Sequence, residues 1–158
     1  MEIRDIKEDD KKWLTELIIK EWGSTKIVTR GNVFEIGSLH GLIAEENNNR
    51  FGVLTYNINK NECEIITLNV IKQNKGIGTL LLQELIKKAK KNGWRRIWAI
   101  TTNDNLTALL FYQKKGFILK AIYPNSIENS RRLKPEIPLV GENGIPIRDE
   151  IEVEFKVS

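Results

Sequence analysis

Apolar residues recur at helical spacing in three stretches of the chain. The first stretch follows Asp9 and Asp10, which can cap a helix, and it stops at Gly23. The second covers residues 77–91, where an apolar face lies opposite a face rich in lysine. The third covers residues 105–115 and stops at a glycine. The pattern therefore predicts three helices, of which the second packs on a sheet.

Runs of β-branched, aromatic and alternating residues predict the strands. The runs are residues 3–6, 39–45, 51–58, 62–70, 94–102, 117–123 and 150–157. Asparagine-rich turns separate the runs between residues 39 and 70, which predicts that these strands form an antiparallel meander. The pattern over residues 62–102 predicts two parallel strands that are connected by a helix. In the last run apolar and mostly acidic residues alternate, so we expect a half-buried strand. Residues 25–37 stay undecided between a loop and a short helix.

The composition is that of a globular chain with one domain, expected to span residues 1–158. Hydrophobic residues make up 41% and charged residues 29%, which argues against disorder and fibrous classes. No run approaches the about 18–20 apolar residues that cross a membrane, and the charged start argues against a signal peptide. The lone cysteine, Cys63, agrees with a reducing compartment. We therefore expect a cytoplasmic protein without a membrane partner.

Charge and side-chain chemistry narrow the ligand classes. A formal net charge of +4 favours an anionic ligand, but it is too small to indicate nucleic acid without a recognition helix. The single histidine, His40, has no nucleophile or acid nearby in sequence, which favours a structural role. Glu62 and Glu64 flank Cys63 and would raise the pKa of its thiol, which argues against an acetyl-cysteine intermediate. Clustered metal ligands are absent from the sequence, so we expect no metal.

The most informative motif is a glycine-bearing loop between the strand that ends at Val70 and the next helix. Gly76 and Gly78 stand where this helix begins. Backbone N–H groups there are unpaired and partly positive, and glycine lets a phosphate approach them closely. The dinucleotide fingerprint does not fit, because Leu81 replaces its third glycine, and the P-loop lysine and hydroxyl are also missing. A phosphate site and a plain helix start both remain open.

A second motif lies on the helix predicted at 105–115. Asn105, Ala108 and Tyr112 project from one side of this helix, because they are spaced i, i+3 and i+7. The tyrosine hydroxyl could protonate a leaving group, and the small alanine would leave room for a ligand chain. A half-exposed tyrosine with a solvated hydroxyl is the alternative.

Together, the two motifs resemble those of the GNAT superfamily of N-acetyltransferases. Residues 73–78, Gln-Asn-Lys-Gly-Ile-Gly, are similar to its Gln/Arg-x-x-Gly-x-Gly/Ala loop, and residues 105–117 are similar to its following motif. The likeness covers residues 39–123 well and 124–149 hardly at all. It implies an α/β (α+β) domain with a mixed, largely antiparallel sheet of about six or seven strands and helices on both faces. It also implies transfer of an acetyl group from acetyl-CoA to a primary amine in a ternary complex.

The resemblance further implies roles for individual residues. The pantetheine of acetyl-CoA would pair with the backbone from Leu68 through Asn69 to Val70, and an N–H near Val70 would polarise the thioester carbonyl. Asn105 would bind the pantetheine arm or fix its helix, and Tyr112 would protonate the departing thiolate. The pyrophosphate would bind backbone amides of Gln73, Lys75, Gly76, Ile77, Gly78 and Thr79.

Four questions stay open at this point. Glu64 stands at a strand position from which some family members take a general base, but an ordinary glutamate facing solvent is the alternative. The acceptor amine is not specified by family resemblance. A non-catalytic acyl-CoA-binding regulatory module is the alternative function, although Tyr112 argues against it, and a homodimer is neither required nor excluded.

Residues 124–149 form a connection that is long for a hairpin and holds all four prolines. We predict that it selects the acceptor, with Asn125 and Ser126 capping a short helix. Charged residues of this connection would lie at or near the mouth of the acceptor cleft and favour an amine that also carries an acidic group. These residues are Glu128, Arg131, Arg132 and Arg148. An arm that covers the sheet edge or builds a dimer interface is the alternative.

Overall fold

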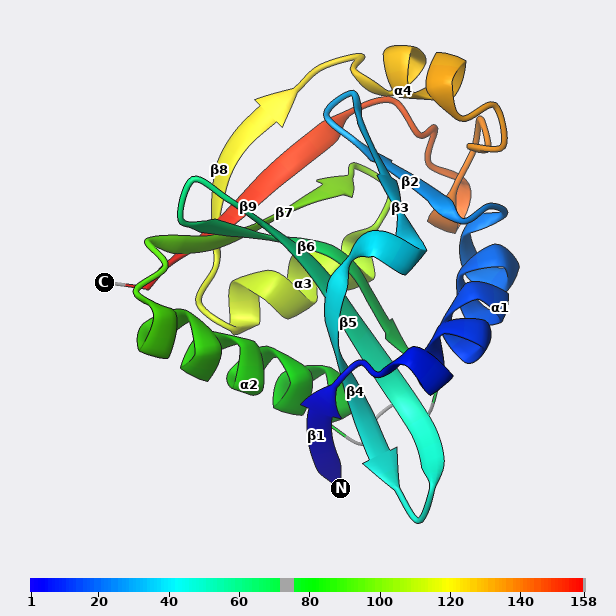
Figure 1. Ribbon diagram of the computed structural model, residues 1–158. Helices are drawn as coiled ribbons and strands as arrows, with labels where there is room; N and C mark the ends of the chain where they lie inside the picture. The colour runs from blue at the N-terminus through cyan, green and yellow to red at the C-terminus, as the bar shows by residue number, and fades with distance from the viewer. Residues whose placement is uncertain (72–75, 158) are drawn as a thin grey trace.

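Seven strands form one mixed sheet in this computed structural model, which describes residues 1–71 and 76–157 (Figure 1). All neighbouring strands are antiparallel except β6 and β7, which are parallel because a helical crossover joins them. The predicted mixed, largely antiparallel sheet is thus confirmed. The order across the sheet is β1 (Glu2–Asp5), β4 (His40–Glu46), β5 (Asn49–Asn59), β6 (Glu62–Val70), β7 (Arg96–Thr102), β9 (Glu150–Lys156) and β8 (Ile118–Tyr123).

Two helices cover one face of the sheet (Figure 1). The first, α2 (Ile77–Asn92), buries Leu81 and Leu85 against the strands and turns most of its lysines outward. It ends at Gly93, whose φ of 69° is the left-handed conformation typical of a helix end. The second, α3 (Leu106–Lys114), packs against the same core through Ala108, Leu109, Phe111 and Tyr112. Both helices lie where the sequence predicts them.

The opposite face is covered by α1 (Lys11–Trp22) and by a hairpin of β2 (Lys26–Thr29) and β3 (Asn32–Glu35). Leu14 and Ile18 of α1 are buried, together with residues of the hairpin and the sheet. The undecided segment 25–37 is therefore mostly a hairpin, and its two turn residues both have positive φ, which suits the twist of paired strands. The prediction of helices on both faces is confirmed.

The parallel strands β6 and β7 separate after a short stretch of pairing. Their pairs cover only residues 63–65 of β6 and 97–99 of β7. Ile66 is then a bulge, because two successive residues of β5 pair with the β6 residues on either side of it. The carboxyl ends of the two strands consequently diverge and leave a gap in the middle of the sheet.

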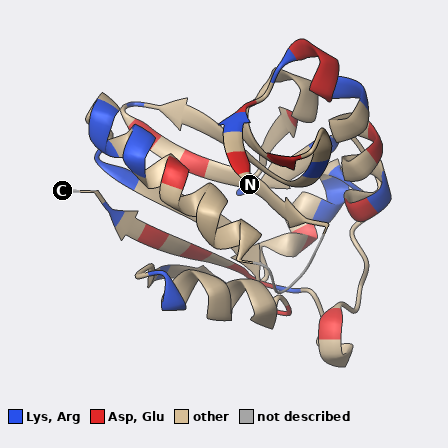
Figure 2. Cartoon of the chain, turned by 90° about the horizontal axis from the view of Figure 1, so that it is seen from below, with Lys and Arg blue, Asp and Glu red and all other residues tan. Residues whose placement is uncertain are grey.

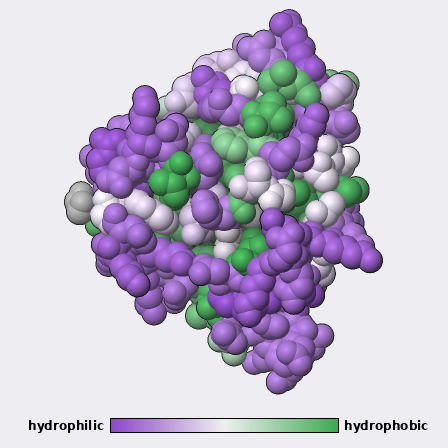
Figure 3. Space-filling view, in the orientation of Figure 1, coloured by the Kyte–Doolittle hydropathy of each residue, from purple (hydrophilic) through white to green (hydrophobic). Residues whose placement is uncertain are grey.

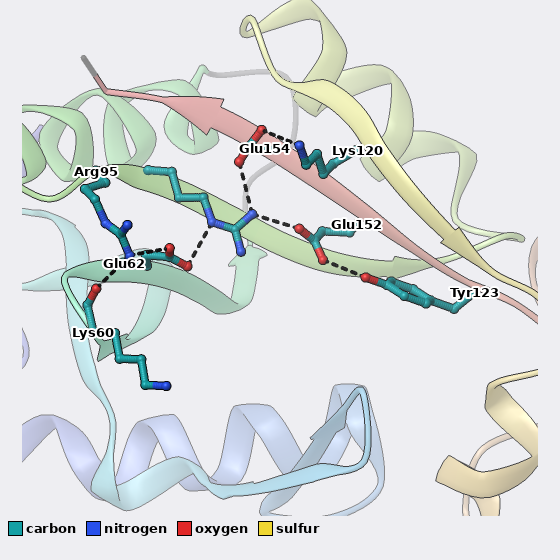
Figure 4. A network of polar contacts seen from close by, with 8 residues as sticks. Lys60, Glu62, Arg95, Lys120, Tyr123, Glu152 and Glu154 are labelled. Carbon is teal, nitrogen blue, oxygen red and sulfur yellow. Dashed lines mark hydrogen bonds and ion pairs between the residues drawn. The ribbon is translucent and has the colours of Figure 1, made fainter.

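The acidic face of β9 is buried, so the predicted half-buried strand is wrong in this respect. Glu152 and Glu154 are only 8% and 5% exposed. Arg96 of β7 donates to both, at 2.7 and 3.2 Å, and the Tyr123 hydroxyl donates to Glu152 at 3.0 Å (Figure 4). Figure 2 shows the acidic positions alternating along the strand. An alternating pattern indicates that one face of the strand is polar. It does not indicate whether that face contacts water or a buried arginine.

The long connection between β8 and β9 contains α4 (Ile127–Leu133), which follows Ser126 as predicted. The hydroxyl of Ser126 does not cap this helix; it accepts the backbone N–H of Glu150 at 3.1 Å. Arg131 donates to three backbone carbonyls of the connection, those of Ile137, Pro138 and Ile147. These bonds give the connection a defined path across the end of the sheet.

The surface seen in Figure 3 is mostly hydrophilic, with apolar side chains in small groups. Within residues 1–71 and 76–157, no helix is both long and apolar enough to cross a membrane.

Asp10 joins three segments at the start of α1. Its buried carboxylate accepts from the guanidinium of Arg4 at 2.7 and 2.9 Å, from Arg50 at 2.8 Å and from the Lys7 N–H at 2.7 Å. The sequence predicts that Asp10 caps α1. Its side chain does not do so, because these partners use its oxygens. The Arg4 hydrogen bond holds the pKa of Asp10 well below its usual range, against the effect of burial.

We predict that Asp10→Asn lowers the free energy of unfolding by about 3 kcal/mol at pH 7, because Arg50 loses its carboxylate partner and Arg4 keeps only Glu45. The folded-state pKa of Asp10 is depressed, so its stabilisation is present above the unfolded pKa of about 4 and is lost as the pH falls further. Urea denaturation at pH 7 and pH 3 measures both effects. The exposed Asp9→Asn is the control, and an equal loss in the two variants would contradict the prediction.

Candidate functional site

The gap between β6 and β7 opens into a cleft on the helical face of the sheet. We call it the α2–α3 cleft; its volume is 370 Å³. Asn69 instead lines a second cleft on the other face, and Gln73 and Lys75 lie outside the described residues. The remaining predicted cofactor residues all line the α2–α3 cleft, and they are Leu68, Val70, Gly76, Ile77, Gly78, Thr79, Asn105 and Tyr112.

The second cleft lies on the opposite face, between the end of α1, the β2–β3 hairpin and the α4 connection. We call it the α1–α4 cleft; its volume is 580 Å³. Both clefts are lined by the same residues where the strands diverge, which are Trp22, Ile66, Leu68, Ile100, Thr101 and Asn105. The two clefts therefore meet through the sheet, so that molecules bound on opposite faces can touch each other.

The start of α2 forms one wall of the α2–α3 cleft. Gly76 precedes the helix with a φ of 69°, and the first helical hydrogen bond runs from the Leu80 N–H to the Gly76 carbonyl at 3.0 Å. The N–H groups of Ile77, Gly78 and Thr79 come before this bond and have no acceptor within the helix. A Cβ on Gly78 would lie 3.4 Å from the Phe111 ring. This helix end can bind an anion such as a phosphate.

Asn105 and Tyr112 line the opposite wall of the α2–α3 cleft. The side-chain oxygen of Asn105 accepts the Ala108 N–H at 3.0 Å, so it caps α3 and sets where this helix begins. Tyr112 lies nearly two turns later, is 6% exposed and packs against the rings of Phe111 and Phe117. Burial raises the pKa of Tyr112 above its usual range, which keeps its hydroxyl protonated at neutral pH. The alternative of a half-exposed tyrosine does not hold.

Glu64 lies on the same face as the α1–α4 cleft but does not line it. Its carboxylate is 5% exposed and accepts the hydroxyl of Thr29, from the hairpin, at 2.7 Å. Burial raises the pKa of Glu64 to about 7, and the nearby charge of Glu152 adds to this effect. Glu64 is therefore not an ordinary exposed glutamate. It lines a separate hollow, and its link to the α1–α4 cleft is the hydroxyl of Thr29, which lines that cleft.

Comparison with known proteins shows to which family this chain belongs. The model of the acetyltransferase (GNAT) family matches residues 4–117. The chain belongs to the GNAT family of acetyltransferases. The uncharacterized protein YdhI of Bacillus subtilis (strain 168) is 48% identical over 142 residues, which are 89% of each chain.

Solved structures agree with this assignment of the family. A Bacillus subtilis acetyltransferase in complex with CoA superposes with a TM-score of 0.72 and 25% identity over 98% of this chain and 97% of that one. A GNAT family acetyltransferase from Elizabethkingia anophelis with acetyl-CoA bound shares the fold, with a TM-score of 0.71, 24% identity and coverage of 98% and 97%.

Several residues of this GNAT acetyltransferase site were not found from the sequence. Trp22, which lines both clefts, fits an ordinary apolar helix position, and Thr29 lies in the undecided segment. Glu150 lines the α1–α4 cleft while 2% exposed, and it accepts the Arg30 N–H at 3.0 Å and its guanidinium at 3.4 Å. The alternating pattern around Glu150 places it on a polar face, but nothing local shows that this face lines a cleft.

The other candidates of the sequence lie away from both clefts. His40 is exposed on β4 and stacks on the Tyr56 ring at 5.7 Å, which agrees with a structural role. Cys63 is fully buried in the core, and burial raises the pKa of its thiol further than the charge of Glu64 does. Within the two described ranges, no group of three or more His, Cys, Asp or Glu residues could hold a metal ion.

We predict that Glu64 makes the protein less stable as the pH rises from about 4.5 to about 7. In this window the folded state holds a proton on Glu64 that the unfolded state, with a pKa of about 4.3, has released. Urea denaturation between pH 5 and pH 8 should show this decline in the wild type and a smaller one in Glu64→Gln. Glu84→Gln, on the outer side of α2, is the control. A carboxyl carbon resonance of Glu64 that titrates near pH 4 would contradict the prediction.

Proposed function

We propose that this GNAT acetyltransferase transfers an acetyl group from acetyl-CoA to a primary amine by direct attack in a ternary complex. One observation carries the proposal: two clefts on opposite faces meet where β6 and β7 diverge. An acetyl-CoA in the α2–α3 cleft would present its thioester at the gap, and an amine in the α1–α4 cleft would reach it from the other side. No covalent enzyme intermediate is needed, which fits the buried, inert Cys63.

The α2–α3 cleft suits the cofactor. The pyrophosphate would lie on the N–H groups from Gly76 to Thr79, with Gln73 and Lys75 as further expected contacts outside the described residues. The pantetheine would run along the edge of β6 from Leu68 to Val70. The side chain of Asn69 points to the other face, where it accepts from Trp22 Nε1 at 3.4 Å, so we expect only its backbone to take part. Related structures in complex with CoA and with acetyl-CoA support acetyl-CoA as the ligand of this chain.

The chemistry follows from the groups at the gap. The amine nitrogen attacks the thioester carbon, the C–S bond breaks, and an N–H near Val70 stabilises the oxyanion that forms between these steps. The departing thiolate takes a proton from Tyr112, whose raised pKa keeps that proton available at neutral pH. The product amide and free CoA then leave from opposite faces.

Glu64 is the general base that we propose for the amine. A base with a pKa of about 7 can accept a proton near neutral pH. Because Thr29 donates its hydroxyl to Glu64 at 2.7 Å and lines the α1–α4 cleft, the threonine oxygen can receive the amine proton while passing its own to the carboxylate. Glu64 would therefore act through Thr29 rather than by direct contact.

A screen for acetyl-CoA-dependent thiol release over a panel of primary amines tests the proposed reaction. We expect release with some amines and not without amine, and the mass of the product should be that of the amine plus one acetyl group. Binding of acetyl-CoA without turnover of any amine would instead support the alternative of an acyl-CoA-binding module, which membership of an acetyltransferase family does not favour.

We predict that Gly78→Glu abolishes acetyl-CoA binding, because a carboxylate at the start of α2 would occupy and repel the pyrophosphate. Gly78→Ala is the matched control. Its Cβ would lie 3.4 Å from the Phe111 ring, which is an ordinary contact, so binding should persist. Calorimetry should show no heat for the glutamate variant at concentrations that saturate the wild type. Unchanged affinity in Gly78→Glu would contradict the assigned phosphate site.

We predict that Tyr112→Phe lowers kcat by about 10²-fold and leaves the Kd for acetyl-CoA nearly unchanged, because it removes only the proton donor. The ring contacts with Phe111 and Phe117 stay in place. Tyr56→Phe, a buried tyrosine outside both clefts, is the control and should leave kcat unchanged. Equal losses of binding and turnover in Tyr112→Phe would indicate a structural tyrosine.

A further inference from the structure

The α4 connection places one lysine inside the α1–α4 cleft. Lys134 follows the last residue of α4, and its backbone N–H donates to the Ser130 carbonyl at 2.8 Å, which fixes its position. The residue is 6% exposed and lines the cleft. Its ammonium lies 6.0 Å from the centre of the Trp22 ring, and Trp22 borders both clefts. Lys134 therefore brings a positive charge close to where the two clefts meet.

This ammonium has no anionic partner among the described residues. No hydrogen bond or ion pair joins its Nζ to a described side chain or carbonyl, and the Trp22 ring is at the limit of a cation–π contact. Burial lowers the pKa of Lys134, while the nearby Glu136 only partly opposes this effect. The Nζ atom itself is accessible, because the described residues leave only Glu154 Oε2 as a buried side-chain nitrogen or oxygen without a hydrogen-bond partner. The ammonium therefore faces the space of the α1–α4 cleft, where an oxyanion could bind it.

The buried carboxylates of the cleft already have partners. Glu150 accepts from the backbone and guanidinium of Arg30, and Asp104 accepts from the Thr102 hydroxyl and the Glu142 N–H. The other acidic residues of the cleft are exposed, so water and salt screen them, and they are Glu21, Glu136 and Glu142. The exposed acids can attract an ammonium, whereas the ammonium of Lys134, which has no ion pair with a described residue, is available to an anionic group of a ligand.

The arginines that the sequence predicted to favour an acidic acceptor make other contacts. Arg131 binds three carbonyls of the connection, and Arg148 pairs with Asp149 at 3.0 Å. Glu128, Arg131 and Arg148 line a separate hollow, and Arg132 does not line the α1–α4 cleft. The four residues predicted to lie near the mouth of the cleft therefore do not line the α1–α4 cleft.

We infer that Lys134 selects acceptors in which the primary amine is accompanied by an oxyanion, a carboxylate or a phosphate. The oxyanion binds the Lys134 ammonium, and the amine extends past Trp22 toward the gap between β6 and β7. This inference rests on the proposed acetyl transfer and names its substrate class. Simple alkylamines and polyamines, which carry no oxyanion, leave Lys134 unpaired and are poorer acceptors.

Matched pairs of amines test this selection. Amino acids are compared with their carboxamides, and phosphoethanolamine is compared with ethanolamine, so that the two pairs distinguish a carboxylate from a phosphate. For the wild type we expect kcat/KM to be at least about tenfold higher for the acidic member of one pair, the usual effect of a charged hydrogen bond. Lys134→Met should abolish this preference and leave the neutral member unchanged, whereas Lys134→Arg should retain part of it. Lys87→Met, on the exposed side of α2, should behave as the wild type.

A binding measurement separates this inference from the proposed reaction. Calorimetry with the CoA-loaded protein needs no turnover, and the acidic member should bind the wild type more tightly than Lys134→Met. Such a difference without any acetylation would support Lys134 and contradict the proposed transfer. Equal binding and equal kcat/KM of acidic and neutral members would overturn the inference even if amines are acetylated. The methionine variant should be about as thermally stable as the wild type, because it keeps the apolar stem of the side chain and breaks no ion pair with a described residue.

Discussion

The short parallel pairing between β6 and β7 is the constraint on which the site depends. The two strands are held together only over residues 63–65 and 97–99. The bulge at Ile66 then changes the direction of β6 while β5 continues to pair with it on the other side. A regular parallel ladder would close the sheet and separate its two faces. Because the ladder ends early, clefts on the two faces share their walls.

The two faces offer different electrostatic environments at this gap. On the helical face, the start of α2 provides backbone N–H groups and a partial positive charge, with glycines that leave the backbone accessible. On the other face, carboxylates and one lysine surround a larger cleft. The helical face therefore suits the phosphates of a polyanionic cofactor, and the acidic residues of the other face suit the ammonium group of an acceptor.

The acidic residues under the hairpin link stability to chemistry. Glu152 and Glu154 are compensated by Arg96, whereas Glu64 has, among residues 1–71 and 76–157, only the Thr29 hydroxyl as a hydrogen-bond partner. Its charged form is therefore penalised, and its pKa rises to about 7. The same burial that would destabilise an ionised Glu64 at high pH gives the site a carboxylate suited to accepting protons near neutral pH.

The sequence by itself determined the elements whose signals are local. Periodicity placed α2 and α3, and the glycines of α2 with Asn105 and Tyr112 of α3 indicated a cofactor site. The tertiary structure alone decided the environment of side chains that meet partners far along the chain. Arg30 and Glu150 are 120 positions apart, and Lys134 and Trp22 also come from distant segments. Burial and pKa depend on such contacts, which hydrophobic periodicity does not encode, so the buried acids and the lysine of the cleft became visible only in the fold.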